Sequence, residues 1–297
     1  VQHVEPRGQR RLTRPHRATR QSGYFFDSHH KMRGSWAALH WDGEDSPRVS
    51  RDYIANMRKK YGERSPVYKV RVKGEFVAAA DGVIPLELCE AAKVREVAVT
   101  SSAHTVWGVD VARFGDDSSA LAKRKGNHQL EPVKEWWGKD TMQTAGLIKA
   151  EWDATPEKQR PIAINVDVIG IGAGVVDRLK EMGLPVVGIN VAETEAVNAK
   201  QERQFHRLRD ELWWKGREWL EAKDCKLCDD DETIAELTTP TYSLLSNGLI
   251  KVEGKDELKA RGVKSPDRAD AWLLTFADTR GVGQDMKPLK INTKYIV

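Results

Sequence analysis

The amino-acid sequence predicts an α/β domain with a mixed β-sheet, and the order of its segments carries that prediction. Between residues 104 and 277, three strand-like segments follow one another directly, and further strands then alternate with helical patterns. Such an order is typical of a mixed sheet flanked by helices. Two of the apolar strands end in, or run into, an aspartate, which places possible chemistry at the ends of strands.

The part of the chain before residue 99 is predicted to contain short elements and no chemistry of its own. Residues 1–21 hold six arginines against the single acid Glu5, so we expect a disordered basic leader that could also bind phosphate. In the following block the predicted strands are residues 23–26, 36–41 and 67–76. Ser50 is a suitable N-cap for a helix over residues 51–61. The block contains too little apolar material for an independent domain.

The first half of the main domain is predicted to begin with three strands. They cover residues 104–110, 119–125 and 129–137, and Gly126-Asn127 forms the tight connection between the second and the third. Asp140 then caps a helix that runs to about residue 153.

The second half is predicted to alternate strands and helices before a hairpin and a closing helix. The elements, in order, are a buried strand (161–168), a helix (173–182), a strand (185–191), a long amphipathic helix (201–222), a hairpin (241–245 and 249–252) and a final helix to residue 277. Ser246-Asn247-Gly248 forms the hairpin turn. Ser265 as N-cap and Pro266 as the first helical residue favour the start of the last helix.

The composition restricts the class of protein. No apolar stretch approaches the roughly 20 residues that cross a bilayer, and the N-terminus has no apolar run typical of a secretory signal. Three cysteines argue against a disulfide scaffold and fit a reducing cytosol. We therefore expect a cytoplasmic protein with no membrane partner.

Acids in apolar surroundings mark the candidate site. Asp110 and Asp167 each end a predicted apolar strand, where an uncompensated charge is costly. Asp270 lies one helical turn after Asp267, so both carboxylates can point to one site. The loop after Asp110 adds Asp116 and Asp117. For Asp116, Asp117 and Asp267 an equally good reading is that they are turn and cap residues.

Three acids on three separate elements are what a magnesium- or manganese-dependent nuclease requires. Hard divalent cations prefer oxygen ligands. Two such ions about 4 Å apart can activate a water molecule and stabilise the leaving oxygen of a phosphodiester. The sequence therefore predicts that Asp110, Asp167 and Asp270 form a metal site.

Other kinds of site are disfavoured. Gly170, Gly172 and Gly174 follow a strand, but their spacing does not give a dinucleotide fingerprint, and the acid before them would repel phosphates. The pair Cys225 and Cys228 leaves only one further cysteine, too few for a four-thiolate zinc site. The sequence has no GxxxxGK[ST] loop, so ATPase activity is not expected from this chain alone.

Three motifs together resemble the nuclease motifs of phage terminase large subunits. They are residues 108–117 (GVDVARFGDD), 166–179 (VDVIGIGAGVVDRL) and 264–271 (KSPDRADA). Upstream, residues 22–27, 44–49 and 68–76 resemble the end of the family's ATPase domain and its linker. The resemblance implies an RNase H-like domain over residues 99–280, an ATPase-domain remnant with linker over 22–98 and a tail over 281–297. Members of the family begin with a full ATPase bearing Walker motifs, so we expect a fragment or a truncated prophage copy.

The resemblance also implies roles for these residues. Asp110, Asp167 and Asp270 match the catalytic acids, Asp267 matches a supporting metal-site residue, and Asp116 or Asp117 would assist the second ion. The implied function is an endonuclease that uses two Mg²⁺ or Mn²⁺ ions to cut concatemeric double-stranded DNA. Its partners would be the small terminase subunit and the portal protein, in the host cytoplasm at the procapsid. The alternatives are a silent prophage remnant, a motor fragment that binds DNA or portal, and another RNase H-like nuclease such as a junction resolvase.

Overall fold

The computed structural model describes residues 3–6, 24–63, 68–76, 82–112, 117–194 and 203–277, and its largest sheet has six strands. Along the sheet the order is β5-β4-β3-β7-β8, and β6 also pairs with β4. The strands are β3 (Thr105–Asp110), β4 (Ser119–Lys125), β5 (His128–Gln129), β6 (Lys134–Trp136), β7 (Ala163–Asp167) and β8 (Val186–Ile189). Strand β3 is antiparallel to β4 and parallel to β7, which is parallel to β8. The predicted mixed α/β sheet is confirmed.

One predicted strand is two short strands in the structure. Residues 129–137 were expected to be continuous, but β5 and β6 pair with different parts of β4. Pro132 lies between them and has no N–H to donate to a neighbouring strand.

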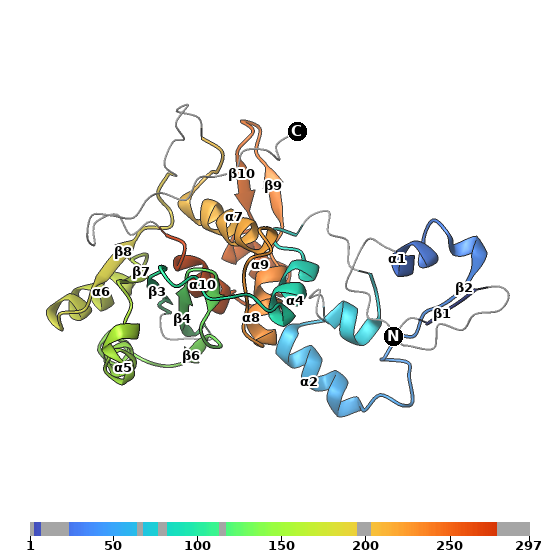
Figure 1. The fold of residues 1–297 in the computed structure, drawn as a ribbon, viewed down its shortest axis with the longest axis horizontal. Coiled ribbons are helices and arrows are strands. Elements are labelled where there is room, and N and C mark those ends of the chain that lie inside the picture. The colour runs from blue at the N-terminus through green and yellow to red at the C-terminus, as the bar shows by residue number, and fades with distance from the viewer. Residues whose placement is uncertain are drawn as a thin grey trace.

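Helices cover both faces of this sheet (Figure 1). On one face α5 (Thr141–Ala154) and α6 (Gly172–Glu181) share a core with Trp107, Val109 and Ile164. On the other face α10 (Asp267–Leu274) packs on β3 and β4, and α7 (Leu208–Glu221) and α8 (Asp231–Thr238) pack on α10. The predicted cap of α5 is confirmed, since Asp140 Oδ1 accepts from Gln143 N at 2.7 Å.

The remaining elements depart from the sequence prediction in several places. The predicted long helix over residues 201–222 begins only at Leu208, because the backbone of Phe205 pairs with Ile250 instead. The hairpin is confirmed as β9 (Tyr242–Leu244) and β10 (Ile250–Val252). Helices α4 (Leu86–Val94), α8 and α9 (Lys255–Ala260) were not predicted. No helix among the described residues is long and apolar enough to cross a membrane.

The N-terminal block is more helical than predicted. The strand expected over residues 23–26 is wrong where it is described: residues 24–26 begin α1 (Tyr24–His29), where the rings of Phe26 and His30 stack one turn apart, and residue 23 lies outside the described residues. Residues 69–73 form a π-helix that Gly74 ends in a left-handed conformation, so the expected strand over 67–76 is wrong. Strand β2 (Trp36–Leu39) and helix α2 (Arg51–Tyr61) are confirmed. Within the leader expected to be disordered, β1 (His3–Pro6) pairs with β2.

The segment before residue 99 packs on the main domain through a shared core. Ile84 and Cys89 are buried in the same cluster as Leu212 and Trp272. Arg71 and Lys93 both form ion pairs with Asp231 at the start of α8. The segment before residue 99 and the main domain therefore share one hydrophobic core.

Candidate active site

The backbone alternation of two neighbouring strands directs Asp110 and Asp167 toward α10. Gly108, two residues before Asp110, lies so close to α10 that a Cβ there would overlap the carbonyl oxygen of Ala271. Asn165, two residues before Asp167, donates from Nδ2 to the carbonyl of Leu274 at 2.8 Å. Because residues i and i+2 share one face of a strand, both aspartates face α10 at the carboxyl ends of parallel strands.

The first turn of α10 brings two more acids to this edge of the sheet. The helix starts one residue later than predicted, with Pro266 as N-cap and Asp267 as its first residue. Its N-terminal turn is held from α8, where Glu236 Oε2 accepts from Ala269 N at 3.1 Å. Asp267 is 5% exposed, and its Oδ2 accepts from Ser118 N at 2.9 Å and from Ser118 Oγ at 3.2 Å.

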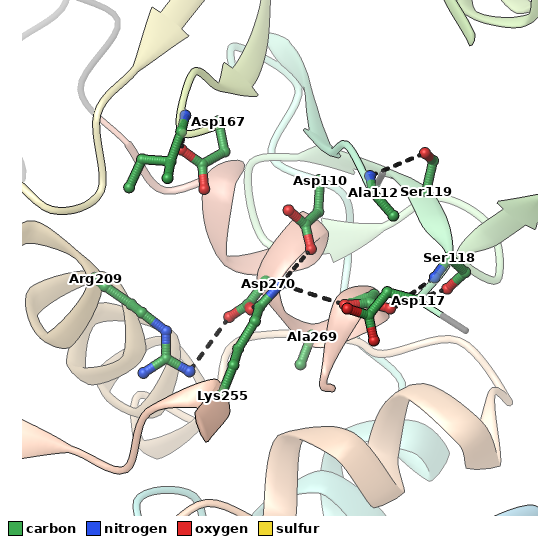
Figure 2. A network of polar contacts seen from close by, with 12 residues as sticks. Asp110, Ala112, Asp117, Ser118, Ser119, Asp167, Arg209, Lys255, Ala269 and Asp270 are labelled. Carbon is green, nitrogen blue, oxygen red and sulfur yellow. Dashed lines mark hydrogen bonds and ion pairs between the residues drawn. The ribbon is translucent and has the colours of Figure 1, made fainter. Parts of the chain in front are cut away.

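The ammonium group of Lys255, the first residue of α9, lies among these carboxylates (Figure 2). Its Nζ is 2.9 Å from Asp110 Oδ2, 3.3 Å from Asp267 Oδ1 and 3.2 Å from Asp270 Oδ2. This lysine was not among the residues that the sequence motifs indicate. The available signal was weak: a lysine directly after Gly254 at a helix start, where a cation is unfavourable unless acids compensate it.

The charges in this cluster shift the pKa values of its members. Burial raises the pKa of Asp110 to about 7; the Lys255 charge opposes this shift, whereas Asp270 and Asp267 add to it. Burial alone would lower the pKa of Lys255, but the charges of Asp110, Asp270 and Asp267 outweigh it, and the pKa stands well above its ordinary value. The cluster therefore favours a cation at the Lys255 ammonium position.

Asp167 lies beside this cluster without joining it directly. Its Oδ1 accepts from Ile169 N at 3.0 Å, and within the described chain no hydrogen bond or ion pair links it to Lys255. Burial raises its pKa, the bond from Ile169 and the charge of Lys255 lower it, and Asp270 raises it. Arg209 of α7 reaches the same side, with Nη2 at 3.6 Å from Asp270 Oδ1.

The loop acids lie at the outer edge of the site. Asp117 forms an ion pair with Lys259 at 3.0 Å, and its side chain is 39% exposed. Asp116 lies outside the described residues. Asp110, Asp117, Asp267 and Lys255 line one cavity of about 160 Å³, closed on another side by residues 169–171.

Glycines let a helix begin directly at this cavity. Gly170 has a φ of +76°, which a residue with a side chain adopts only with strain. A Cβ on Gly172, the first residue of α6, would overlap the carbonyl oxygen of Asp167. Gly172 thus allows α6 to begin in direct contact with the end of β7.

The donor set fits a hard divalent cation, but the side chains are spaced for an ammonium group. Among the described residues, no three acidic, imidazole or thiol side chains are arranged to hold a metal ion as they stand. The oxygens lie 2.9–3.3 Å from Lys255 Nζ, whereas oxygen ligands lie about 2.0–2.1 Å from Mg²⁺. A metal would therefore require Lys255 to withdraw and the carboxylates to close in.

Comparison with known proteins supports the motif analysis. No family model matches the chain. A protein of Enterobacteria phage P7 described as a probable terminase large subunit is 26% identical over 276 residues, covering 87% of this chain and 56% of the relative. The chain thus spans about half the length of the curated relative it matches.

Solved structures with the same fold are terminase nuclease domains. The nuclease domain of the large terminase subunit of bacterial virus Sf6 has a TM-score of 0.54 at 18% identity, covering 66% of this chain and 98% of that one. A lysine-to-alanine variant of that domain with manganese has a TM-score of 0.53 at 17% identity, covering 66% and 99%. The resemblance to terminase large subunits and the RNase H-like fold are confirmed.

Proposed function

We propose that this chain, which resembles terminase large subunits and has the fold of their nuclease domains, is a divalent-metal-dependent endonuclease. It would hydrolyse phosphodiester bonds of concatemeric double-stranded DNA during viral genome packaging. The observation that carries the proposal is the convergence of the carboxylates of Asp110, Asp267 and Asp270 on one cationic group. Asp167 stands at the end of the neighbouring parallel strand.

The proposed metal ligands are Asp110, Asp167 and Asp270, supported by Asp267 and by Asp116 or Asp117. Two Mg²⁺ or Mn²⁺ ions bound there would activate the attacking water and stabilise the leaving oxygen. Asp110, which is buried beside Asp267 and Asp270, would supply carboxylate oxygen to the bound metal. Ser118 would keep Asp267 oriented, because its backbone N–H and its hydroxyl both donate to Asp267 Oδ2.

The charges of the site explain why added cations would be needed. Among the described residues, the carboxylates of Asp110, Asp167, Asp267 and Asp270 lie near two cations, Lys255 and Arg209, so this part of the site is net negative and would repel a phosphodiester. Bound divalent ions would make the net charge of the site positive. Lys255 can leave, since its side chain is 37% exposed and it begins a helix of only six residues.

The proposed partners follow from the phage relative rather than from this site. They are double-stranded DNA, the small terminase subunit and the portal protein, in the cytoplasm of the host cell at the procapsid. Because the chain spans about half of that relative, its share in the complete packaging reaction is also a proposal.

A plasmid-cleavage assay tests the nuclease. We expect supercoiled plasmid to be nicked and linearised with Mn²⁺ or Mg²⁺ and to stay intact with EDTA. Asp110→Ala and Asp167→Ala should each reduce the rate by roughly a thousandfold, because metal coordination supplies several kcal/mol of transition-state stabilisation. Asp153→Ala is the control, since Asp153 is exposed on α5 and pairs with Lys149.

The same assay separates the alternatives. One alternative is a silent remnant or a DNA-binding motor piece that does not cut DNA. DNA binding by the folded protein without cleavage in either metal would support that reading and contradict the nuclease. Cleavage confined to four-way junctions would indicate a resolvase instead.

A further inference from the structure

Arg209 is a largely buried cation beside the acid cluster. The proposed mechanism assigns no role to this arginine. It is the second residue of α7, and its side chain is 17% exposed. Its Nη1 donates to the carbonyl of Glu253 at 3.1 Å. Its Nε and Nη2 are buried and have no hydrogen-bond acceptor within the described chain. Buried guanidinium N–H groups without acceptors are costly, so an unmet donor next to an acid site calls for an explanation.

Two contacts hold the guanidinium of Arg209, and a third holds its backbone. Its plane lies over the ring of Trp213, one helical turn further along α7, with 5.5 Å between Cζ and the ring centroid. The bond to Glu253 fixes one end of the guanidinium group. The Arg209 backbone N–H donates to the carbonyl of Val191, just beyond β8, at 3.0 Å. Arg209 is therefore anchored on α7, in contrast to the more exposed Lys255.

Asp270 lies between these two cations, one at each oxygen. Its Oδ1 is 3.6 Å from Arg209 Nη2, and its Oδ2 is 3.2 Å from Lys255 Nζ (Figure 2). The first distance is too long for a hydrogen bond but lies within ion-pair range. A small shift of the carboxylate toward α7 would convert it to a charge-assisted hydrogen bond of about 2.7–2.9 Å.

We propose that Arg209 is a positioning residue for Asp270: it holds Oδ1 so that Oδ2 stays turned toward the cation position that Lys255 occupies. This inference rests on the proposed nuclease function. When Lys255 withdraws, Asp270 loses one of its two cationic partners, and Arg209 keeps the carboxylate from rotating away. The planar, fixed guanidinium suits this task better than an ammonium group on a flexible stem.

Removal of Arg209 should affect metal affinity and turnover in different ways. Arg209→Gln removes a positive charge next to Asp270, so the site becomes more negative and should bind Mn²⁺ at least as tightly as the wild type. Turnover should nevertheless fall by roughly 10–100-fold, as for the loss of other residues that orient metal ligands. A variant that is merely damaged in structure would lose affinity and turnover together.

The experiment measures Mn²⁺ affinity by isothermal titration and plasmid cleavage at saturating Mn²⁺, on full-length proteins whose thermal unfolding is recorded first. Arg209→Lys is the second variant, since it keeps the charge but not the planar fork. We expect wild-type Mn²⁺ affinity and partly restored, still reduced cleavage. Lys215→Gln is the control, because it removes a cation from the same helix that pairs only with Glu211 among the described residues.

The outcomes separate this inference from the proposed function. Unchanged or tighter Mn²⁺ binding with reduced turnover in Arg209→Gln, or unchanged binding with reduced turnover in Arg209→Lys if only that variant folds, supports positioning. Cleavage at the wild-type rate by the Arg209 variant that folds overturns the positioning role. A parallel loss of Mn²⁺ affinity and turnover in that folded variant overturns it as well. A wild type that never cleaves DNA would instead contradict the proposed nuclease.

Discussion

Four carboxylates, those of Asp110, Asp167, Asp267 and Asp270, lie in one small region, where the charge of Asp270 opposes the ionisation of Asp110 and Asp167. Lys255 offsets part of this repulsion through contacts with three of them. An incoming divalent ion must compete with the same ammonium group. Under the proposed function, Lys255 would therefore stabilise the metal-free protein and weaken metal binding at the same time.

Replacement of Lys255 should reverse both effects. For Lys255→Met we expect a lower melting temperature without metal, because three carboxylates lose their shared partner. Mn²⁺ should bind tighter by roughly tenfold, a difference of about 1.4 kcal/mol, because no lysine has to be displaced. Thermal unfolding with and without Mn²⁺ measures both, with Lys251→Met as control, since Lys251 pairs with Glu257. Unchanged or weaker Mn²⁺ binding would rule out the competition.

The burial of Asp110 also predicts how the protein responds to pH. Because burial raises the folded-state pKa of Asp110 to about 7, above its ordinary value, the folded protein binds the extra proton and the metal-free form loses stability as pH rises toward 7. A metal must displace that proton, so Mn²⁺ affinity should rise by about tenfold per pH unit below pH 7 and level off above it. Mn²⁺ titrations of the protein at pH 6, 7 and 8 measure this dependence, and an Mn²⁺ affinity that does not change with pH would contradict it.

Sequence reasoning found acids of the site but not its cations. Asp110 and Asp167 stood out because an acid inside an apolar strand is costly without a partner. Lys255 and Arg209 are ordinary surface-type residues in the sequence, and their role arises only when α9 and α7 fold against α10. Their positions depend on long-range packing, which no local pattern encodes.

Close packing between β3 and α10 brings the acids together at the scale of elements. Gly108 allows α10 to lie directly on β3, and Gly216 of α7 faces Leu273 and Trp272 of α10 at a similarly short range. Strand and helix thereby hold Asp110 and Asp270 in reach of one lysine. A side chain at Gly108 would overlap the backbone of α10 and push the helix outward, whereas one at Gly216 would meet only the ends of the Leu273 and Trp272 side chains.

Two glycine substitutions, one expected to destabilise the protein and one expected to stabilise it, test this packing. Gly108→Ala should destabilise the protein by roughly 1–3 kcal/mol or more, because its Cβ would overlap the α10 backbone. Gly146 lies on the exposed face of α5, where an added Cβ would meet no other atom within 4 Å. Gly146→Ala should therefore stabilise the protein by about 0.5–1 kcal/mol. Urea unfolding of both variants gives the comparison, and a neutral Gly108→Ala would mean that α10 is free to shift.

The sequence predicted the elements of the sheet better than the short helices. Apolar runs identified β3 and β7, which are covered on both faces, and Asp140 as N-cap identified α5. The alternation of Val70 and Val72 suggested a strand, yet both side chains are buried from a π-helix. Helices α8 and α9, of eight and six residues, span too few turns to show a period.

At the scale of the whole molecule, residues on both sides of position 99 contribute to one core. Val83, Ile84 and Cys89 are at most 1% exposed in the cluster that also contains Leu212 and Trp272. Burial of each large apolar side chain stabilises a protein by about 1.5–3 kcal/mol, against a total stability of about 5–15 kcal/mol. The segment before the predicted boundary is therefore needed for stability.

Truncation tests this dependence. A chain that begins at residue 99 should be insoluble or lack cooperative unfolding, because it exposes the α7 and α8 surfaces that α4 covers. A chain that begins at residue 42 keeps α2, Arg71 and α4 and should melt cooperatively. Near-ultraviolet circular dichroism during thermal unfolding distinguishes the two, and a stable chain from residue 99 would show that the earlier segment is dispensable.

Asp110, Asp167 and Asp270 are proposed to hold divalent cations. Anomalous diffraction from crystals of the protein soaked in Mn²⁺ tests it most directly. We expect strong anomalous peaks between the carboxylates of β3, β7 and α10, with Mn–O distances near 2.2 Å, about those of a hard divalent ion, and with Lys255 turned away. Bound Mn²⁺ only elsewhere on the protein, or acids still closed around Lys255 at saturating Mn²⁺, would contradict the account.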